Sequence, residues 1–259
     1  MKIYTKESLI EALHDIRDMG WIKSRRPGND GAVGNTLEDL LGIAENNLPI
    51  PNAAEWEIKA QRDNTTSLTS LFHMEPSPRA LKFIPKILLP IYGWRHQNAG
   101  TRYPESEMSF RQTICAGRFS DRGFSVEVDR QDGKVVVVFD RTKVSSDQSS
   151  WFNEVIARGG GRIEHNPYWG FKDLYHKAGT KLKNCFFIKA ESKKEDGSEY
   201  FRFKDFLMLK DLSLDNFINA IESGNVYIDF DARTGHNHGT KFRITEKKIP
   251  DLYSESLII

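Results

Sequence analysis

Cysteine is scarce in this sequence, which has only two, Cys115 and Cys185, among 259 residues. They lie far apart in strand-like stretches, and this favours two buried reduced thiols over a disulfide. The absence of a Cys-x-x-Cys pair makes a structural zinc site improbable. No run of about 18 apolar residues occurs either, so no membrane span is expected. These absences are typical of a cytosolic protein.

An excess of charge of one sign is also lacking. Lys and Arg number 37 against 36 Asp and Glu, which gives a formal net charge of +1. This balance argues against a uniformly basic nucleic-acid-binding chain, so any basic surface has to be local. The glycine run at 158–162 is not followed by Gly-Lys-Ser/Thr, so it is not a phosphate-binding P-loop.

Short helical and strand-like stretches alternate along the chain and predict a mixed α and β fold. Thr5 suits the N-cap of a first helix that ends near Gly20. Thr36 suits the N-cap of a second helix, with Asp39 as its capping-box partner. A strand follows at 56–61, and residues 66–73 are expected to form a second strand antiparallel to it.

The second half is rich in strand patterns separated by turn residues. The predicted elements are a strand at 108–116, a hairpin of 123–130 and 134–140, a hairpin of 184–191 and 199–204, a helix capped by Ser213 and stopped by Gly224, a strand at 226–230 and a last strand near 241–244.

The strand at 56–61 carries the residue pair with the clearest chemical potential. Side chains in a strand alternate between faces, so Glu57 and Lys59 share one face while Trp56 and Ile58 share the other. Asn52 lies on the turn just before. A carboxylate, an ammonium and an amide oxygen so grouped are suited to hold a divalent metal and activate water. The alternative is an exposed ion pair on an edge strand.

Other polar groups along the chain allow two interpretations each. Lys23, Arg25 and Arg26 begin a glycine-rich loop that either contacts phosphate or is a solvated loop. Glu38 either complements its helix dipole or reaches a metal site. His73 ends a strand as a structural residue or a contact at the minor groove or the edge of an active site.

A polar cluster near the C-terminus offers donors and acceptors of the kind that read base edges. Its members are Asp229, Asp231, Arg233, His236, His238, Lys241 and Arg243. The alternatives for the His-x-His pair are a metal site, which lacks a clear third ligand, and a polar turn.

Several stretches, in order along most of the chain, resemble the MvaI/BcnI family of restriction endonucleases, which is similar in turn to the mismatch-repair nicking enzyme MutH. They are residues 20–35, 34–43 and 45–47, Trp56-Glu57-Ile58-Lys59, residues 67–72, Ala190-Glu191-Ser192-Lys193 and residues 236–244.

This resemblance implies a PD-(D/E)xK nuclease with an α+β fold, in which helices flank a central mixed sheet and a second lobe recognises DNA. Residues 1–140 would form mainly the catalytic lobe and 141–259 mainly the recognition lobe, with segments of the two interleaved. The two lobes would grip duplex DNA between them like a clamp. The implied activity is that of a type II restriction endonuclease, which hydrolyses DNA at a short specific site by sequential nicking as a monomer.

The resemblance also implies roles for particular residues. Glu57 would bind the metal together with Asn52 and the backbone carbonyl of Ile58, and Lys59 would orient the attacking water or stabilise the developing charge. Glu38 would support the metal site from its helix. The implied cofactor is Mg²⁺, with Mn²⁺ as a substitute and Ca²⁺ supporting binding without cleavage.

Double-stranded DNA is the implied partner, in the cytoplasm of a bacterium or archaeon and beside a separately encoded methyltransferase, with no membrane involved. The residues expected to contact DNA are Lys23, Arg25, Arg26, His73, Asp229, Arg233, His236, His238, Lys241 and Arg243. Relatives carry a basic residue near the position of Asp231, so this chain departs from the family pattern there.

Asn52 is the main departure from the family pattern, because the family has an Asp at this position. An amide oxygen ligates a cation but brings no charge, so the change should weaken metal binding. Two explanations stay open: a natural Asn that the subfamily tolerates, or an Asp→Asn replacement that traps uncleaved DNA. Two rival functions follow, a DNA-binding form without cleavage and a MutH-like nickase.

Overall fold

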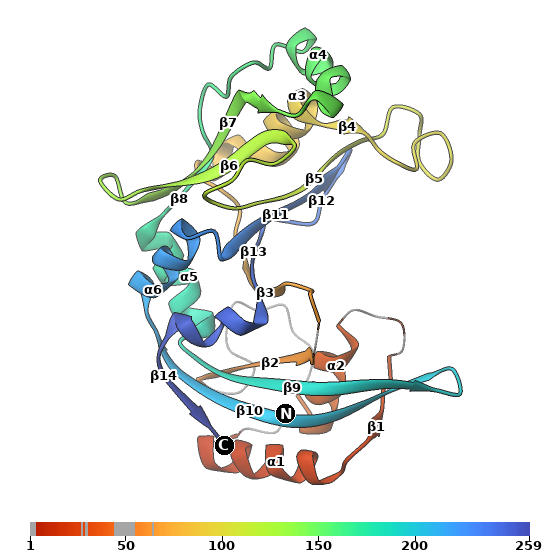
Figure 1. The fold of residues 1–259 in the computed structure, drawn as a ribbon, viewed down its shortest axis with the longest axis vertical. Coiled ribbons are helices and arrows are strands. Elements are labelled where there is room, and N and C mark those ends of the chain that lie inside the picture. Colours follow the sequence, from red (N-terminus) through yellow and green to blue (C-terminus); the bar gives the residue numbers. More distant parts are fainter. Residues whose placement is uncertain (1–3, 27, 29–30, 44–54, 64) are drawn as a thin grey trace. The chain divides into compact units, whose positions relative to one another are not determined.

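The computed structural model describes residues 4–26, 28, 31–43, 55–63 and 65–259. Its contacts divide the chain into two units, each built from segments that are separated in sequence (Figure 1). The first unit comprises Met1–Thr69, Lys177–Asn216 and Thr245–Ile259, and the second comprises Ser70–His176 and Phe217–Ile244. The assignment of catalysis and DNA recognition to parts of the chain stays a prediction.

The first unit is built on a five-stranded mixed sheet in the order β1-β10-β9-β2, with β14 also paired to β10. Its strands are β1 (Ile22–Lys23), β2 (Trp56–Arg62), β9 (Asn184–Glu195), β10 (Ser198–Leu212) and β14 (Tyr253–Ile258). β2 runs parallel to β9 in a register that sets Glu57 opposite Cys185, while β9 and β10 form a long antiparallel hairpin. The expected hairpin at 184–204 is therefore confirmed.

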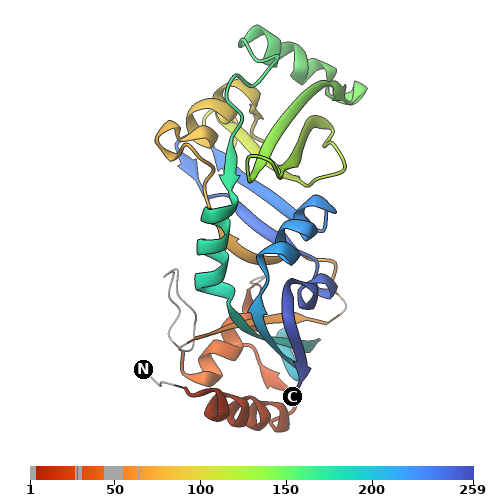
Figure 2. The ribbon, with the colours of Figure 1, turned by 90° about the vertical axis from the view of Figure 1, so that its left-hand side faces the viewer.

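Two helices, α1 (Lys6–Asp18) and α2 (Ala32–Leu41), cover one face of this sheet. Leu9 and Leu13 of α1 and Leu37 of α2 are fully buried against Phe186 of β9, in a core that also includes Trp56. The rings of Trp56 and Phe186 lie 4.6 Å apart between centroids. Figures 1 and 2 both place the C-terminus beside α1, and Ile259 packs against this core.

The predicted boundary of α2 was wrong, whereas that of α1 is confirmed. Thr5 caps α1 in a capping box with Ser8. α2 begins at Ala32 instead of after Thr36, and the Thr36 hydroxyl donates to the Ala32 carbonyl at 2.7 Å. A threonine satisfied in this way by the preceding turn does not end a helix, so its capping preference is not expressed.

The second unit holds a six-stranded sheet and a three-stranded sheet. The larger runs β3-β13-β11-β5-β4, with β12 on β11, and the smaller runs β6-β7-β8. Their strands are β3 (Thr69–His73), β4 (Trp94–Arg95), β5 (Met108–Ile114), β6 (Arg122–Asp129), β7 (Lys134–Val144), β8 (Tyr168–Gly170), β11 (Val226–Arg233), β12 (His236–Asn237) and β13 (Lys241–Ile244).

Four α-helices accompany these sheets or connect them along the chain. They are α3 (Leu89–Tyr92), α4 (Ser149–Ala157), α5 (Phe171–Leu182), which continues into the first unit, and α6 (Leu214–Glu222). The short helical turns are η1 (Arg79–Leu81), η2 (Ile84–Leu88), η3 (Ser146–Gln148), η4 (Glu246–Lys248) and η5 (Pro250–Leu252). Among the described residues no helix has the length and apolar content to cross a membrane.

The expected pairing of the strand at 66–73 with β2 was wrong, because β3 joins the larger sheet beside β13. Aromatic packing accounts for this placement. Phe72 stacks on Phe242 of β13 with centroids 4.9 Å apart and also contacts Phe217 of α6. The hairpin of β6 and β7 was predicted correctly, and Gly133 supplies the positive φ that its turn needs.

Truncating Phe186 to alanine should destabilise the protein by about 3–5 kcal/mol, because it removes a fully buried ring from the core of the first unit. The matched control is Tyr175→Ala, at a ring that is 56% exposed, which should change stability by no more than about 0.5 kcal/mol. Urea titration of both variants measures the difference. Equal stabilities would show that the core is not where this structure places it.

Candidate active site and nucleic-acid interface

Glu57 and Lys59 lie together on β2, on the face opposite the core side chains of Trp56 and Ile58. The Lys59 ammonium is 3.3 Å from Glu57 Oε1, and the two side chains are only 12% and 4% exposed. The alternative of an exposed pair was therefore wrong. Burying a carboxylate costs free energy unless cations or hydrogen-bond donors compensate its charge, so Glu57 needs such partners around it.

A second cation faces the same carboxylate oxygen. Lys181, near the end of α5, places its ammonium 3.7 Å from Glu57 Oε1. The sequence pattern missed this residue because a lysine in the last turn of a helix ordinarily complements the helix dipole. Two ammonium groups thus neutralise one buried oxygen, although no strand or motif signal connects residue 181 with residue 57.

The other carboxylate oxygen of Glu57, Oε2, is buried and has no hydrogen-bond partner in the part of the chain that the structure describes. A buried charged oxygen without a partner carries a large desolvation cost, which a cation relieves. Mg²⁺ and similar hard cations prefer such carboxylate oxygens. Glu57 therefore fits the metal-binding role that the sequence predicts.

Two buried neutral groups, the Cys185 thiol and the Tyr253 hydroxyl, lie near Glu57. Burial raises the pKa of the Cys185 thiol to about 12, and the Glu57 charge adds to this effect against the Lys59 charge and a hydrogen bond with Tyr253. Burial first, and then the nearby Cys185 and Glu57, raise the pKa of Tyr253 well above its usual value. Both groups stay protonated at neutral pH, so they supply a low-dielectric wall around Glu57 and no competing anion.

The remaining predicted metal donors are placed only in part. Asn52 lies outside the described residues. Ile58 has its side chain in the core, so only its backbone is available as a donor, and Glu38 is half-buried on α2. Across residues 4–43 and 55–259, apart from the few positions not described, no group of three or more His, Cys, Asp or Glu side chains is arranged to hold a metal.

The predicted base-reading residues occupy one face of the larger sheet in the second unit. Alternate residues of β11 are buried, and the intervening Asp229, Asp231 and Arg233 are half-buried on the opposite face. Lys241 and Arg243 of β13 follow the same alternation. These charged side chains therefore share one face of the sheet, and their contact with DNA stays a prediction.

The carboxylates on this face are held by cations and a hydroxyl from the neighbouring strands. Asp229 accepts from the Thr113 hydroxyl at 2.8 Å and from Arg243 at 3.3 Å. Asp231 accepts from Arg111 Nε at 2.9 Å and pairs with Lys241 at 3.5 Å. Thr113 and Arg111, both on β5, were missed from the sequence because cross-strand neighbours are set by register.

The other predicted contact residues are distributed over both units. His236 and His238 face each other with ring nitrogens 3.3 Å apart, and among the described residues no third His, Cys, Asp or Glu is arranged with them to hold a metal. Arg233 pairs with Glu107 at 2.9 Å and lies over the Tyr103 ring. The remaining predicted residues, each of them exposed, are Lys23 on β1, Arg25 and Arg26 in the loop after it, and His73 at the end of β3.

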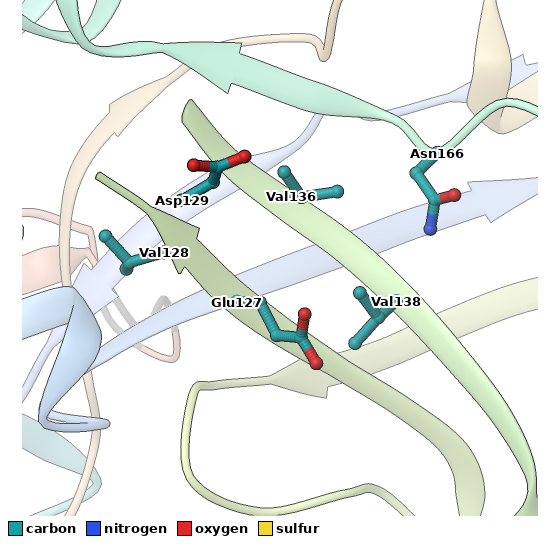
Figure 3. A pocket seen from close by; sticks show the side chains of 6 residues that line it. All are labelled: Glu127, Val128, Asp129, Val136, Val138 and Asn166. Atoms are coloured by element: carbon teal, nitrogen blue, oxygen red, sulfur yellow. The ribbon is translucent and has the colours of Figure 1, made fainter. Parts of the chain in front are cut away.

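A hollow of about 510 Å³ lies over the β6–β7 hairpin and is unsuited to DNA (Figure 3). Glu127 and Asp129 of β6 flank it, with Val136 and Val138 of β7 and Asn166 on its other sides. Two carboxylates at its rim repel a phosphate backbone. The chemistry of this hollow thus differs from that of the carboxylate–lysine site and of the charged face.

Comparison with known proteins identifies the chain as a restriction endonuclease, a site-specific deoxyribonuclease. The profile of the MvaI/BcnI restriction endonuclease family matches residues 10–253, and the chain belongs to this family. Members of the family generally use divalent metal ions. None of the curated proteins compared matches the chain.

Two solved structures are similar to the whole chain. One is the complex of the restriction endonuclease MvaI with cognate DNA substrate, with 26% identity, a TM-score of 0.78 and coverage of 98% of this chain and 99% of that one. The other is MvaI in the absence of DNA, with 27% identity, a TM-score of 0.57 and complete coverage of both chains. The predicted family and fold class are therefore confirmed.

Replacing Lys181 by methionine should tighten Mn²⁺ binding about fivefold, because the ammonium competes with a metal cation for Glu57 and a partly buried pair contributes about 1 kcal/mol. The matched control is Lys204→Met. Lys204 lies on β10, in the sheet that carries Glu57, but its ammonium pairs with Asp63 and Glu191. Calorimetric titration with Mn²⁺ measures both. Unchanged or weaker binding in Lys181→Met would contradict the competition.

Proposed function

We propose that this chain is a type II restriction endonuclease that hydrolyses DNA phosphodiesters at a short specific duplex site with Mg²⁺. The observation that supports this most is the buried Glu57, whose Oε1 faces two ammonium groups while Oε2 has no partner among the described residues. Such an oxygen suits a hard cation. When bound, the cation polarises the scissile phosphate and lowers the pKa of a coordinated water.

The roles of this chain's own residues follow from their chemistry. Glu57, Asn52 and the backbone carbonyl of Ile58 hold the cation, with Glu38 supporting the site from α2. Lys59 Nζ, held within 3.3 Å of Glu57, orients the attacking water or donates to the phosphate oxygen as negative charge develops on it. The neutral Cys185 and Tyr253 keep water away from this cluster and so strengthen its electrostatic interactions.

DNA binding is divided between two groups of side chains. Lys23, Arg25 and Arg26 are exposed cations suited to phosphate oxygens, which position a duplex without reading its sequence. The charged face of the larger sheet carries the residues suited to base edges, where carboxylates accept from cytosine and guanidinium groups donate to guanine. They are Asp229, Arg233, His236, His238, Lys241 and Arg243, and His73 stands at the end of β3.

We further propose that the enzyme acts as a monomer by nicking one strand and then the other, in the cytoplasm and beside a separate methyltransferase. Mn²⁺ should substitute for Mg²⁺, and Ca²⁺ should support binding without cleavage. The buried reduced cysteines are compatible with that compartment. A MutH-like enzyme would stop after one nick, and a form disabled at Asn52 would only bind.

Replacing Glu57 by glutamine should lower cleavage about 10³-fold or more, since several kcal/mol of charge stabilisation depend on the metal that its carboxylate holds. The assay follows a supercoiled plasmid with Mg²⁺ or Mn²⁺, which the wild type should convert to open circles and then to linear DNA. Duplex binding with Ca²⁺ should persist in the variant.

The control is Glu191→Gln, at a carboxylate of the same sheet that instead pairs with Arg202 and Lys204. It should cleave like the wild type. If open circles accumulate and never become linear, the nickase alternative holds. If wild type binds a duplex but leaves the plasmid intact with either metal, the binding-only alternative holds.

Replacing Asn52 by aspartate should preserve cleavage and raise its rate at limiting Mg²⁺, because a second carboxylate adds charge to the metal site. The measurement is the cleavage rate across a Mg²⁺ titration, with the rise largest at the lowest concentrations. An equal or lower rate at every concentration would count against assigning Asn52 to the metal.

A further inference from the structure

One exposed arginine stands among the predicted base-reading residues without a role in the function proposed above. Arg111 lies on β5, opposite Asp231 of β11 in an antiparallel register, so the two side chains share a face of the sheet. Its side chain is 62% exposed, and its Nε donates to Asp231 Oδ1 at 2.9 Å. The hydrogen bond uses Nε, and the two terminal amino groups of the guanidinium carry its other N–H donors.

The carboxylate that anchors Arg111 is itself held in place. Its second oxygen, Asp231 Oδ2, is 3.5 Å from the Lys241 ammonium of β13. Burial raises the pKa of Asp231, but the hydrogen bond and charge of Arg111, with the charges of Lys241 and His238, outweigh this and lower it overall. Asp231 is therefore ionised at neutral pH and fixes the Arg111 fork through a charge-assisted bond.

Phosphate is a poor occupant for this fork. Asp229 and Asp231 lie on the same face, two residues apart along β11, and already pair with the cations of that face, Arg111, Lys241 and Arg243, for which a phosphate would have to compete. Base edges present no such charge, and the guanine edge in the major groove offers two acceptors, O6 and N7. An arginine fork with two terminal amino groups matches that pair of acceptors.

We infer that Arg111 is a specificity-determining residue that reads a guanine O6/N7 edge, with Asp231 as the positioning residue that orients its guanidinium. This inference rests on the proposed function, because it names one contact of the DNA-reading surface. Lysine keeps the charge of arginine but lacks the planar fork, so the Arg111→Lys change separates the two contributions.

The test selects bound duplexes from a pool with a randomised central segment, in Ca²⁺, using the intact protein and the variants Arg111→Lys, Arg111→Ala and Asp231→Asn. Wild type should enrich one sequence motif. Because a monomer brings one Arg111 to the duplex, both Arg111 variants should lose about 10- to 100-fold of the preference for G·C at one position of the motif, with the other positions retained. Asp231→Asn should weaken the preference at that same position to a smaller extent.

Arg130→Lys is the matched control, because Arg130 is another half-exposed arginine of the second unit, held by Glu222 at the end of α6. It should enrich the wild-type motif. Thermal unfolding of each variant shows whether it is folded. If Arg111→Ala or Asp231→Asn is unfolded, the conservative Arg111→Lys variant still tests whether the planar fork is needed.

Two results would overturn the inference while leaving the proposed function standing. One is a wild-type motif in both Arg111 variants. The other is a uniform loss of affinity at all positions with a smaller salt dependence, which is the behaviour of a phosphate contact. If the wild type enriches no motif and cleaves no plasmid, the proposed function fails and this inference fails with it.

Discussion

The buried carboxylate of Glu57 is the constraint on which the rest of the first unit depends. A charge that is 4% exposed needs compensation. It comes from Lys59, two residues along the same strand, and from Lys181 on α5, the helix that precedes β9 in the chain. The parallel pairing of β2 with β9 sets Cys185 directly opposite Glu57, so its surroundings depend on segments more than a hundred residues apart. The compensation is one-sided, since Oε2 has no partner among the described residues.

On the charged face of the larger sheet, in the second unit, the carboxylates are half-buried and have partners on both sides. Asp229 accepts from Thr113 and Arg243, and Asp231 accepts from Arg111 and pairs with Lys241, so each carboxylate has partners on the strands to both sides. The face thus carries charges of both signs within three strands. A surface patterned in this way is suited to discriminating base edges, whereas exposed cations such as Lys23 and Arg25 suit phosphates.

Local patterns predicted much of the fold and the central pair of the site. The capping box at Thr5, the β6–β7 turn at Gly133 and the alternation that joins Glu57 with Lys59 all follow from nearest neighbours in sequence. Lys181 and Arg111 could not be found in this way, because their roles depend on tertiary packing and on strand register. The pairing of β3 was mistaken for the same reason, since Phe72 finds its partners on β13 and α6.

The most direct test of the central claim is the position of a bound Mn²⁺ in a crystal of the protein, located by its anomalous scattering. The account predicts a peak in coordination contact with Glu57 Oε2, with Lys181 displaced from the carboxylate relative to its metal-free distance of 3.7 Å. A peak elsewhere, with Glu57 still held by both lysines and Oε2 unliganded, would contradict it.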